Sequence, residues 1–475
     1  MEYRIEHDLL GEKQVPADAY YGIQTLRAIE NFHISGVKVN MFPLYIRALA
    51  AVKMGAAKAN HNLGLLPKEI KKAIVQACEE TMDGQLDDHF PIDLIQGGAG
   101  TSTNMNINEV IANRALEIMG HEKGQYEFCH PNNHVNMAQS TNDAYPTAIK
   151  IALQWMNEEL VKELQLLIKS FRKKGEEFTN VIKMGRTQLQ DAVPMTLGQE
   201  FEAFAATLEE EVTRLNTNAA LFREIAMGAT AIGTGINADP EYPDKVVKHL
   251  RKITGLELVK ATNFIEATPD TGAFVIYSGT VKRLGVKLSK ICNDLRLLSS
   301  GPRTGFNEIN LPPMQPGSSI MPGKVNPVIP EVVNQICFIV FGNDLTVTFA
   351  SEAGQLQLNV MEPVIVRSLF ENIQMLRRGM ESLRTNCVDG ITANVEHCKE
   401  MVLNSIGIVT ALNPILGYEI SSSLAKEALK TNGSIYKLVL ERGLIPKDEL
   451  DQILSPENMV KPHHLDRIEE ENDDN

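Results

Sequence analysis

The sequence predicts a mainly α-helical protein whose centre is a bundle of long helices. In four segments apolar residues recur at intervals of three and four, the spacing that gives a helix one apolar face. These segments cover residues 160–171, 201–222, 281–298 and 365–383. In the last two segments the repeat averages about 3.5 residues, which is typical of helices packed in a supercoiled bundle.

The predicted helices are long for an ordinary globular domain. Each runs for about 25 to 30 residues, or about 40 Å at a rise of 1.5 Å per residue. A helix of that length needs partners along its whole apolar face. We therefore expect a central bundle that is shared between subunits.

Three regions follow one another along the chain, whose 475 residues exceed what one core usually supports. Residues 1–141 mix shorter helical patterns with loops rich in Gly and Asn. Residues 142–395 carry the long helices. Residues 396–475 contain short helices and end in the acidic tail EEENDDN, which we expect to be disordered.

Composition and charge exclude several classes of partner. The formal net charge is −14, which argues against nucleic acid and membranes because phosphate binding needs clustered Lys and Arg. The N-terminus has no secretory pattern, and no run approaches the roughly 18 to 20 apolar residues of a membrane span. The six cysteines are scattered without a metal-binding spacing. We therefore expect a soluble cytoplasmic protein without a metal site.

Residues 301–330 interrupt the helical pattern. They include seven prolines and four glycines, so they cannot be helical throughout, and a long loop in a compact protein is often functional. A nucleotide phosphate loop is excluded, because five residues separate Gly317 from Gly323 and Val325 follows Lys324. The glycines and Lys324 can still stabilise an anion through backbone N–H groups and charge.

Three further segments are dense in small hydroxyl and amide side chains, at 97–106, 139–143 and 185–191. The first lacks the third glycine of a dinucleotide-binding fingerprint. Taken singly, such residues more often cap helices than bind a substrate. Four such segments together predict an enzyme that binds a small anion, and spacing alone leads no further.

The string GSSIMPGKVNP at 317–327 resembles the signature loop of the aspartase/fumarase superfamily. The other three segments are similar to that family's remaining site regions, in the same order, and the resemblance extends over nearly the whole chain. The strings QGGAGT at 96–101, QSTND at 139–143 and VIPE at 328–331 are most similar to the members that deaminate L-aspartate. Similar fumarases usually carry a second Ser in place of Thr141.

This resemblance implies a three-domain, mostly helical fold and a homotetramer built around a central bundle. It also implies active sites that draw residues from three subunits. The implied reaction is the reversible loss of ammonium from L-aspartate to give fumarate, an anti-elimination through an aci-carboxylate. We expect that no cofactor is required, and the sequence leaves open whether a divalent metal acts as an activator.

The resemblance also assigns roles to individual residues. Ser318 resembles the general base that removes the C3 proton. Four hydroxyl groups would hold the β-carboxylate: Thr101, Ser140, Thr141 and Ser319. Three side chains would anchor the α-carboxylate: Thr187, Lys324 and Asn326. Two amides would face the amino group: Asn142 and Gln188.

The chemistry agrees with these residue types and leaves two alternatives open. A serine base needs local donors, such as backbone N–H groups of its loop and Lys324, because an alcohol is a weak acid. Many superfamily members carry His where this chain has Gln188, and an amide cannot titrate, so that position is no acid or base here. The nearest alternative is fumarate hydratase. The other is a non-catalytic structural relative, as in the lens crystallins, against which the intact Ser318 and Lys324 argue.

Overall fold

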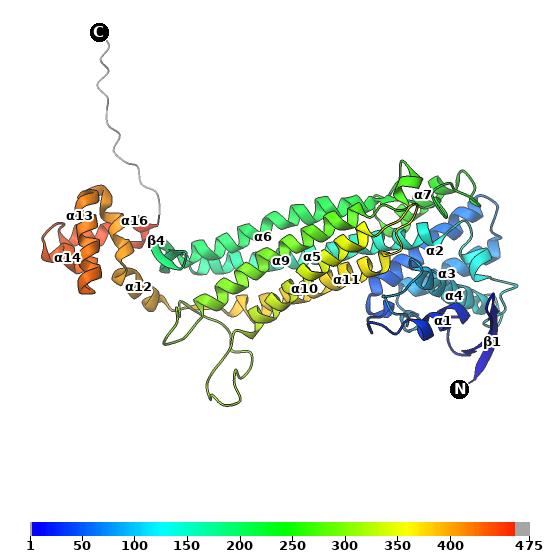
Figure 1. The fold of residues 1–475 in the computed structure, drawn as a ribbon, viewed down its shortest axis with the longest axis horizontal. Coiled ribbons are helices and arrows are strands. Elements are labelled where there is room, and N and C mark those ends of the chain that lie inside the picture. The colour runs from blue at the N-terminus through cyan, green and yellow to red at the C-terminus, as the bar shows by residue number, and fades with distance from the viewer. Residues whose placement is uncertain (1, 461–475) are drawn as a thin grey trace, which may run out of the picture. The chain divides into compact units, whose positions relative to one another are not determined.

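Helices dominate the structure, a computed structural model that describes residues 2–460 (Figure 1). The predicted mainly α-helical class is therefore confirmed. The acidic tail at 469–475, expected to be disordered, lies outside the described residues.

Between residues 141 and 386 lie five helices of 23 to 37 residues (Figure 1). Their bounds are α5 Thr141–Glu177, α6 Leu197–Ala219, α9 Gly272–Leu298, α10 Val328–Glu352 and α11 Glu362–Asn386. The four segments with helical spacing lie in α5, α6, α9 and α11, as predicted. Their repeating apolar residues are buried; Leu284 and Leu288 of α9, for example, have no exposed surface.

Shorter elements complete the described chain. The helices are α1 Ile23–Asn31, α2 Pro43–Asn62, α3 Lys68–Met82, α4 Thr101–Ile118, α7 Tyr242–Thr254, α8 Phe264–Ala267, α12 Val395–Asn404, α13 Val409–Thr431, α14 Ile435–Glu441, α15 Lys447–Ile453 and α16 Pro456–Met459. Three two-stranded sheets are antiparallel: β1 Tyr3–Asp8 with β2 Gly11–Pro16, β3 Ile182–Thr187 with β4 Gln190–Thr196, and β7 Ile309–Asn310 with β8 Thr392–Ala393. One is parallel: β5 Glu224–Ile225 with β6 Val259–Lys260.

The described residues form two compact units, each made of three chain segments. Unit 1 comprises the chain up to Leu164, Glu210–Val286 and Gln335–Gly379. Unit 2 comprises Gln165–Glu209, Lys287–Asn334 and the residues from Met380 onward. The three-domain division at 1–141, 142–395 and 396–475 stays a prediction.

Polar side chains join the long helices inside unit 1. Tyr277 of α9 donates to Asn157 Oδ1 of α5 at 2.9 Å, and Asn157 Nδ2 donates to Asn216 Oδ1 of α6 at 3.1 Å. Ser278 of α9 donates to Asp344 Oδ1 of α10 at 2.8 Å. Buried polar groups are stable only when paired, so these contacts fix which helix faces meet.

In unit 2 the β3–β4 hairpin packs on the C-terminal helices. Ile182 and Met184 of β3 belong to the same buried cluster as Val402, Leu412 and Leu424. Ser405 Oγ also donates to Asp191 Oδ2 of β4 at 2.7 Å. The hairpin is therefore held by apolar burial and by a hydrogen bond, and its two-residue turn projects from this base.

Helix α10 differs from the other long helices because it is apolar on most sides. Its most apolar 18-residue window has a mean hydropathy of 1.4, and only 33% of that window is buried. Five large apolar side chains are exposed on it: Val332, Phe338, Ile339, Leu345 and Phe349. By length and composition α10 could cross a membrane, as could α12 together with residues 406–431, which are bent by 69°. The expectation that no segment would be so apolar is therefore wrong, although core helices of soluble proteins have the same composition.

Candidate active site

The predicted signature loop folds back on itself at its base. Gly317 N donates to Lys324 O at 2.7 Å, and Asn326 Nδ2 donates to Gly317 O at 2.8 Å. A Cβ atom at Gly317 would lie 2.6 Å from Lys324 O, so only glycine fits this crossing. The closed base projects residues 318–323 as one small loop ahead of α10.

Ser318 lies where backbone donors converge. Its Oγ accepts the N–H of Ile320 at 3.2 Å and that of Met321 at 3.1 Å. Hydrogen bonds donated to an oxygen favour its deprotonated form. The backbone donors that a serine base needs are therefore present in the loop itself.

Ser318 and Lys324 line one hollow of about 500 Å³. Prolines and methionines, including Met314 and Met321, form much of its remaining wall. Ser319 and Lys324 are exposed, and Ile320 is 83% exposed at the tip of the loop. In the single chain this loop thus presents polar groups and an apolar tip to the outside.

Thr187 and Gln188 lie at the turn of the β3–β4 hairpin. Thr187 ends β3 opposite Gln190, and the turn residues Gln188 and Leu189 have φ values of +54° and +63°. Each non-glycine residue in this left-handed region costs about 1 kcal/mol or more. Thr187 and Gln188 are exposed, and Leu189 is 64% exposed. The hairpin therefore maintains a strained turn that presents two of the predicted site residues outward.

A buried carboxylate anchors both the hairpin and the loop. Glu308, with no exposed surface, lies 2.8 Å from Lys183 Nζ and accepts from Arg186 Nη1 at 2.5 Å. The Arg186 guanidinium also lies 4.3 Å from the centre of the Phe306 ring. Lys183 and Arg186 belong to β3, whereas Glu308 directly precedes β7 and the signature loop. Two charges therefore fix the hairpin against the start of the loop.

In unit 1 two hydroxyl groups of the 139–143 segment act as acceptors. Asn104 Nδ2 donates to Thr141 Oγ1 at 3.2 Å, and Asn142 N donates to Ser140 Oγ at 3.2 Å. A hydroxyl has one proton and two lone pairs. Ser140 and Thr141 can therefore accept these bonds and still donate a proton to a carboxylate.

Two other predicted ligands use their donors inside the chain. Thr101 Oγ1 donates to Gly98 O at 2.7 Å, and Asn142 Nδ2 donates to Ala231 O at 2.7 Å. The Thr101 hydroxyl must rotate before it can donate to a carboxylate. Asn142 keeps a second amide proton for a ligand.

Lys53, which the sequence did not single out, lies fully buried beneath this segment. Its Nζ donates to Asn104 Oδ1 at 2.6 Å, Gln139 Oε1 at 2.9 Å and Asn136 Oδ1 at 3.0 Å. Three amide oxygens match the three protons of an ammonium group. Burial lowers the pKa of Lys53 to about 7, while the charge of Asp143 acts in the opposite direction. Asn104 then connects Lys53 to Thr141.

Asp143 holds the segment from its other end. Its carboxylate accepts the N–H groups of Ser140 at 2.9 Å, Thr230 at 3.0 Å and Gly228 at 3.1 Å. Burial raises the pKa of Asp143 to about 6, although these hydrogen bonds favour the charged form. The backbone of Ser140 is therefore fixed between two buried charged groups.

The predicted site residues thus fall into three groups. Ser318, Ser319, Lys324 and Asn326 share one loop, and Thr187 and Gln188 share one turn that does not line the Ser318 hollow. Thr101, Ser140, Thr141 and Asn142 belong to unit 1. The supporting groups Lys53 and Glu308 were missed. Lys53 is the only charged residue in the run AAVKMGAA at 50–57 of α2, and that contrast with its small and apolar neighbours was the available signal.

Among residues 2–460, no group of three or more His, Cys, Asp or Glu side chains is close enough to hold a metal ion. The predicted site residues themselves supply hydroxyls, amides, backbone N–H groups and one lysine. Such groups bind carboxylates and stabilise negative charge that develops during a reaction.

Comparison with known proteins agrees with this site chemistry. A family model described as "Lyase" matches residues 11–342, and one described as "Fumarase C C-terminus" matches residues 408–461. Proteins named aspartate ammonia-lyase are similar over 97% of the chain. The protein of Pseudomonas aeruginosa is 61% identical, that of Helicobacter pylori strain J99 58% and that of Escherichia coli K12 56%, with 97%, 98% and 96% of their lengths covered.

Solved structures share the fold. A fumarate lyase:delta crystallin from Brucella melitensis, described as bound to cobalt, is 55% identical with a TM-score of 0.94. A class II fumarase from Schistosoma mansoni is 35% identical with a TM-score of 0.90. In each case 97% of this chain and 100% of the other chain are covered.

The fold and these matches define a lyase of the aspartase/fumarase superfamily. Within it, the chain belongs to the aspartate ammonia-lyase family and is a carbon–nitrogen lyase.

The buried ammonium of Lys53 provides a test of how the site is held. In Lys53→Met three amide oxygens lose their donor, and Asn104 is no longer fixed beneath Thr141. We expect kcat to fall about 10- to 100-fold, because small displacements of positioning groups have effects of that size. Steady-state kinetics and circular dichroism of the purified variant measure this.

Lys58→Met, on the same helix, is the matched control and should leave kcat unchanged. A pH series adds a readout specific to the buried charge. The pKa of Lys53 is about 7 in the folded chain, below the usual lysine value of 10.5, so the unfolded chain binds the proton more strongly between these values. Wild-type stability should therefore rise relative to Lys53→Met from pH 7 to pH 9. Equal kcat in the two lysine variants would contradict the positioning role.

Proposed function

We propose that this chain catalyses the reversible deamination of L-aspartate to fumarate and ammonium. The observation that carries the proposal is its 56–61% identity, along 97% of its length, to proteins named aspartate ammonia-lyase. The arrangement of donors around Ser318 supports the same chemistry. The site offers groups that hold two carboxylates and accept one proton.

In the proposed reaction the Ser318 oxygen, as an alkoxide, removes the C3 proton. The electrons of that C–H bond pass into the β-carboxylate, which becomes a dianionic aci-carboxylate. They then form the C2–C3 double bond as the C2–N bond breaks, and the nitrogen leaves as ammonia. Ammonia takes up a proton to become ammonium, and Ser318 returns its proton to solvent. The N–H groups of Ile320 and Met321 support the charged oxygen.

The β-carboxylate gains charge in this step, so its ligands determine the rate. Ser140 and Thr141 are suited to this role because their oxygens accept bonds from Asn142 and Asn104 and keep their protons for the substrate. Thr101 and Ser319 complete the proposed set. Because Lys53 and Asp143 already fix this segment, its donors need little reorganisation when the charge develops.

Lys324, Thr187 and Asn326 would anchor the α-carboxylate, and Gln188 with Asn142 would face the amino group. Lys324 supplies the charge of this set, and a charged donor gives a strong bond to a carboxylate. Asn326 uses one amide proton for Gly317 and retains the second for a ligand. Gln188 cannot titrate, so its proposed role is to orient the amine.

We further propose a homotetramer whose sites combine residues of three subunits. The exposed apolar residues of α10 support this, because large exposed apolar surfaces commonly mark protein interfaces. The exposed Thr187 turn and the exposed loop tip at Ile320 support it as well. A cytoplasmic location is supported by the sparse, scattered use of cysteine, with all six side chains buried.

The substrate assignment is tested by following fumarate absorbance after L-aspartate or L-malate is added to the purified protein. We expect turnover of aspartate, with malate slower by at least about a hundredfold, because the site must discriminate between amine and hydroxyl. Dehydration of malate without turnover of aspartate would show a fumarate hydratase. Turnover of neither would show a non-catalytic relative.

The roles of Ser318 and Lys324 are separated by kinetics. Ser318→Ala should lower kcat by about 10³-fold with little effect on substrate affinity, since only proton transfer is lost. Lys324→Ala should also weaken binding, by about 2 to 4 kcal/mol for a charge-assisted contact.

Ser299→Ala and Lys399→Ala are the matched controls. The Ser299 hydroxyl, directly after α9, donates to the carbonyls of Leu295 and Arg296 of that helix, and Lys399 is exposed on α12. If Ser318→Ala retains at least a tenth of wild-type kcat, another group must remove the C3 proton.

A further inference from the structure

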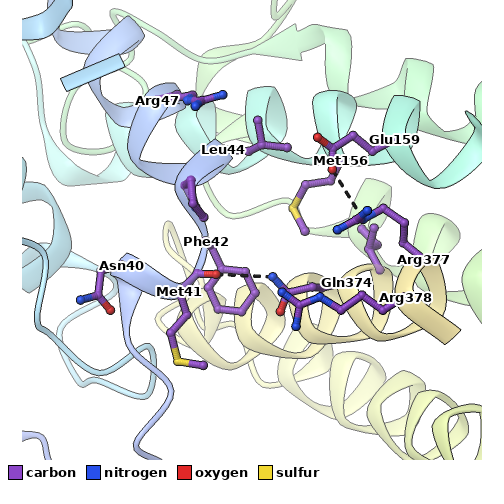
Figure 2. A pocket seen from close by; sticks show the side chains of 12 residues that line it. Asn40, Met41, Phe42, Leu44, Arg47, Met156, Glu159, Gln374, Arg377 and Arg378 are labelled. Atoms are coloured by element: carbon purple, nitrogen blue, oxygen red, sulfur yellow. Dashed lines mark hydrogen bonds and ion pairs between the residues drawn. The ribbon is translucent and has the colours of Figure 1, made fainter. Parts of the chain in front are cut away.

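A second cavity lies in unit 1, and none of the proposed site residues lines it. It has a volume of about 360 Å³, which is within the usual range of ligand sites. Figure 2 shows it between the start of α2, one face of α11 and α5. Twelve residues line it: Asn40, Met41, Phe42, Pro43, Leu44, Arg47, Met156, Glu159, Ile373, Gln374, Arg377 and Arg378.

The charged groups of this cavity are mostly positive. Three arginines and one glutamate line it, so its formal charge is +2. Arg377 Nε lies 3.7 Å from Glu159 Oε2, and the Glu159 side chain is 54% exposed. A long, exposed ion pair contributes little, so an anion can compete with Glu159 for Arg377. Arg47 Nε is buried without a hydrogen-bond partner.

Three donors of α11 line the cavity. Gln374 is three residues before Arg377 and four before Arg378, so its side chain neighbours both on the helix surface. Gln374 Nε2 donates to Met41 O at 3.4 Å, and Figure 2 shows Arg378 extending beside it, while Arg377 extends toward Glu159. A guanidinium group can bind a group with several oxygens through two parallel bonds, so each of these two arginines suits such a ligand.

Apolar side chains also line the cavity. Met41 is 51% exposed and Leu44 of α2 is half-buried, while Phe42 and Met156 are almost fully buried. The first turn of α2 carries no acidic side chain that would repel an anion. A ligand here would contact both positively charged and apolar side chains.

We propose that this cavity binds a phosphomonoester with a compact apolar body. Its phosphate would lie against Arg377 and Arg378, and its apolar part against Met41 and Leu44. A phosphomonoester carries a charge of about −1.5 to −2 near pH 7, which matches the charge of the cavity. All its oxygens lie on one atom, so a single phosphate offers several acceptors to the arginines that line the cavity, whereas the charges of a dicarboxylate are separated.

Phenyl phosphate is a direct probe, with inorganic phosphate, phenol and fumarate for comparison. Calorimetric titration of the wild-type protein should show saturable binding of phenyl phosphate, at least tenfold tighter than phosphate or phenol. The double variant Arg377→Ala/Arg378→Ala should weaken that binding at least tenfold and leave aspartate turnover unchanged. Arg377→Lys/Arg378→Lys keeps the charge but loses the paired donors, and should fall between the two.

Arg223→Ala, which removes an arginine paired with Glu257 elsewhere in unit 1, is the control and should bind phenyl phosphate like wild type. Equal binding by wild type and the double alanine variant would overturn the proposal, as would an absence of saturable binding. Fumarate binding that is as tight as that of phenyl phosphate and equally dependent on Arg377 and Arg378 would replace it with a dicarboxylate site.

Discussion

A charge buried without a partner costs several kcal/mol, and the candidate site is built on charges that satisfy this constraint. Beneath the 139–143 segment, Lys53 is surrounded by three amide oxygens. At the base of the hairpin, Glu308 is paired with Lys183 and Arg186. Each network is costly to disturb, because loss of one partner leaves a buried charge or a buried amide without its hydrogen bond. The segments above them therefore have one arrangement, which a site that stabilises developing charge requires.

The cost of burying a polar group without a partner also explains why the proposed substrate-binding groups are exposed. Thr187, Ser319 and Lys324 are on the surface of the single chain, on a strained turn and on a closed loop. Gln188 and Leu189 both have left-handed φ values, yet Leu189 remains 64% exposed. Packing within the described residues therefore does not offset the cost of this turn. That cost is explained if neighbouring copies cover the turn. Large apolar side chains are also exposed on α10, and an interface with another copy of the chain would bury them.

Much of the fold follows from spacing, whereas the supporting groups do not. The repeats in α5, α6, α9 and α11 predict these helices because a buried face must recur with the helical period. The β3–β4 hairpin was not predicted, since its turn has neither Gly nor Asn at the left-handed positions. Within the site, the string at 317–327 predicts the loop, and its glycine at 317 is required by a crossing of the backbone. Lys53 and Glu308 could not be assigned, because their partners are 51 and 122 residues away in the sequence.

In the proposed assembly, neighbouring copies of the chain complete each site, and subunit exchange is the test of that arrangement. Ser318→Ala and Thr187→Ala proteins, each inactive alone, are unfolded together and refolded, or exchanged under conditions that yield mixed tetramers. If Ser318 and Thr187 of one site come from different subunits, some mixed sites carry neither substitution. Activity should then return to about a quarter of wild type under random mixing in a four-subunit assembly. Mixed tetramers that remain inactive would show instead that each site is built within one chain.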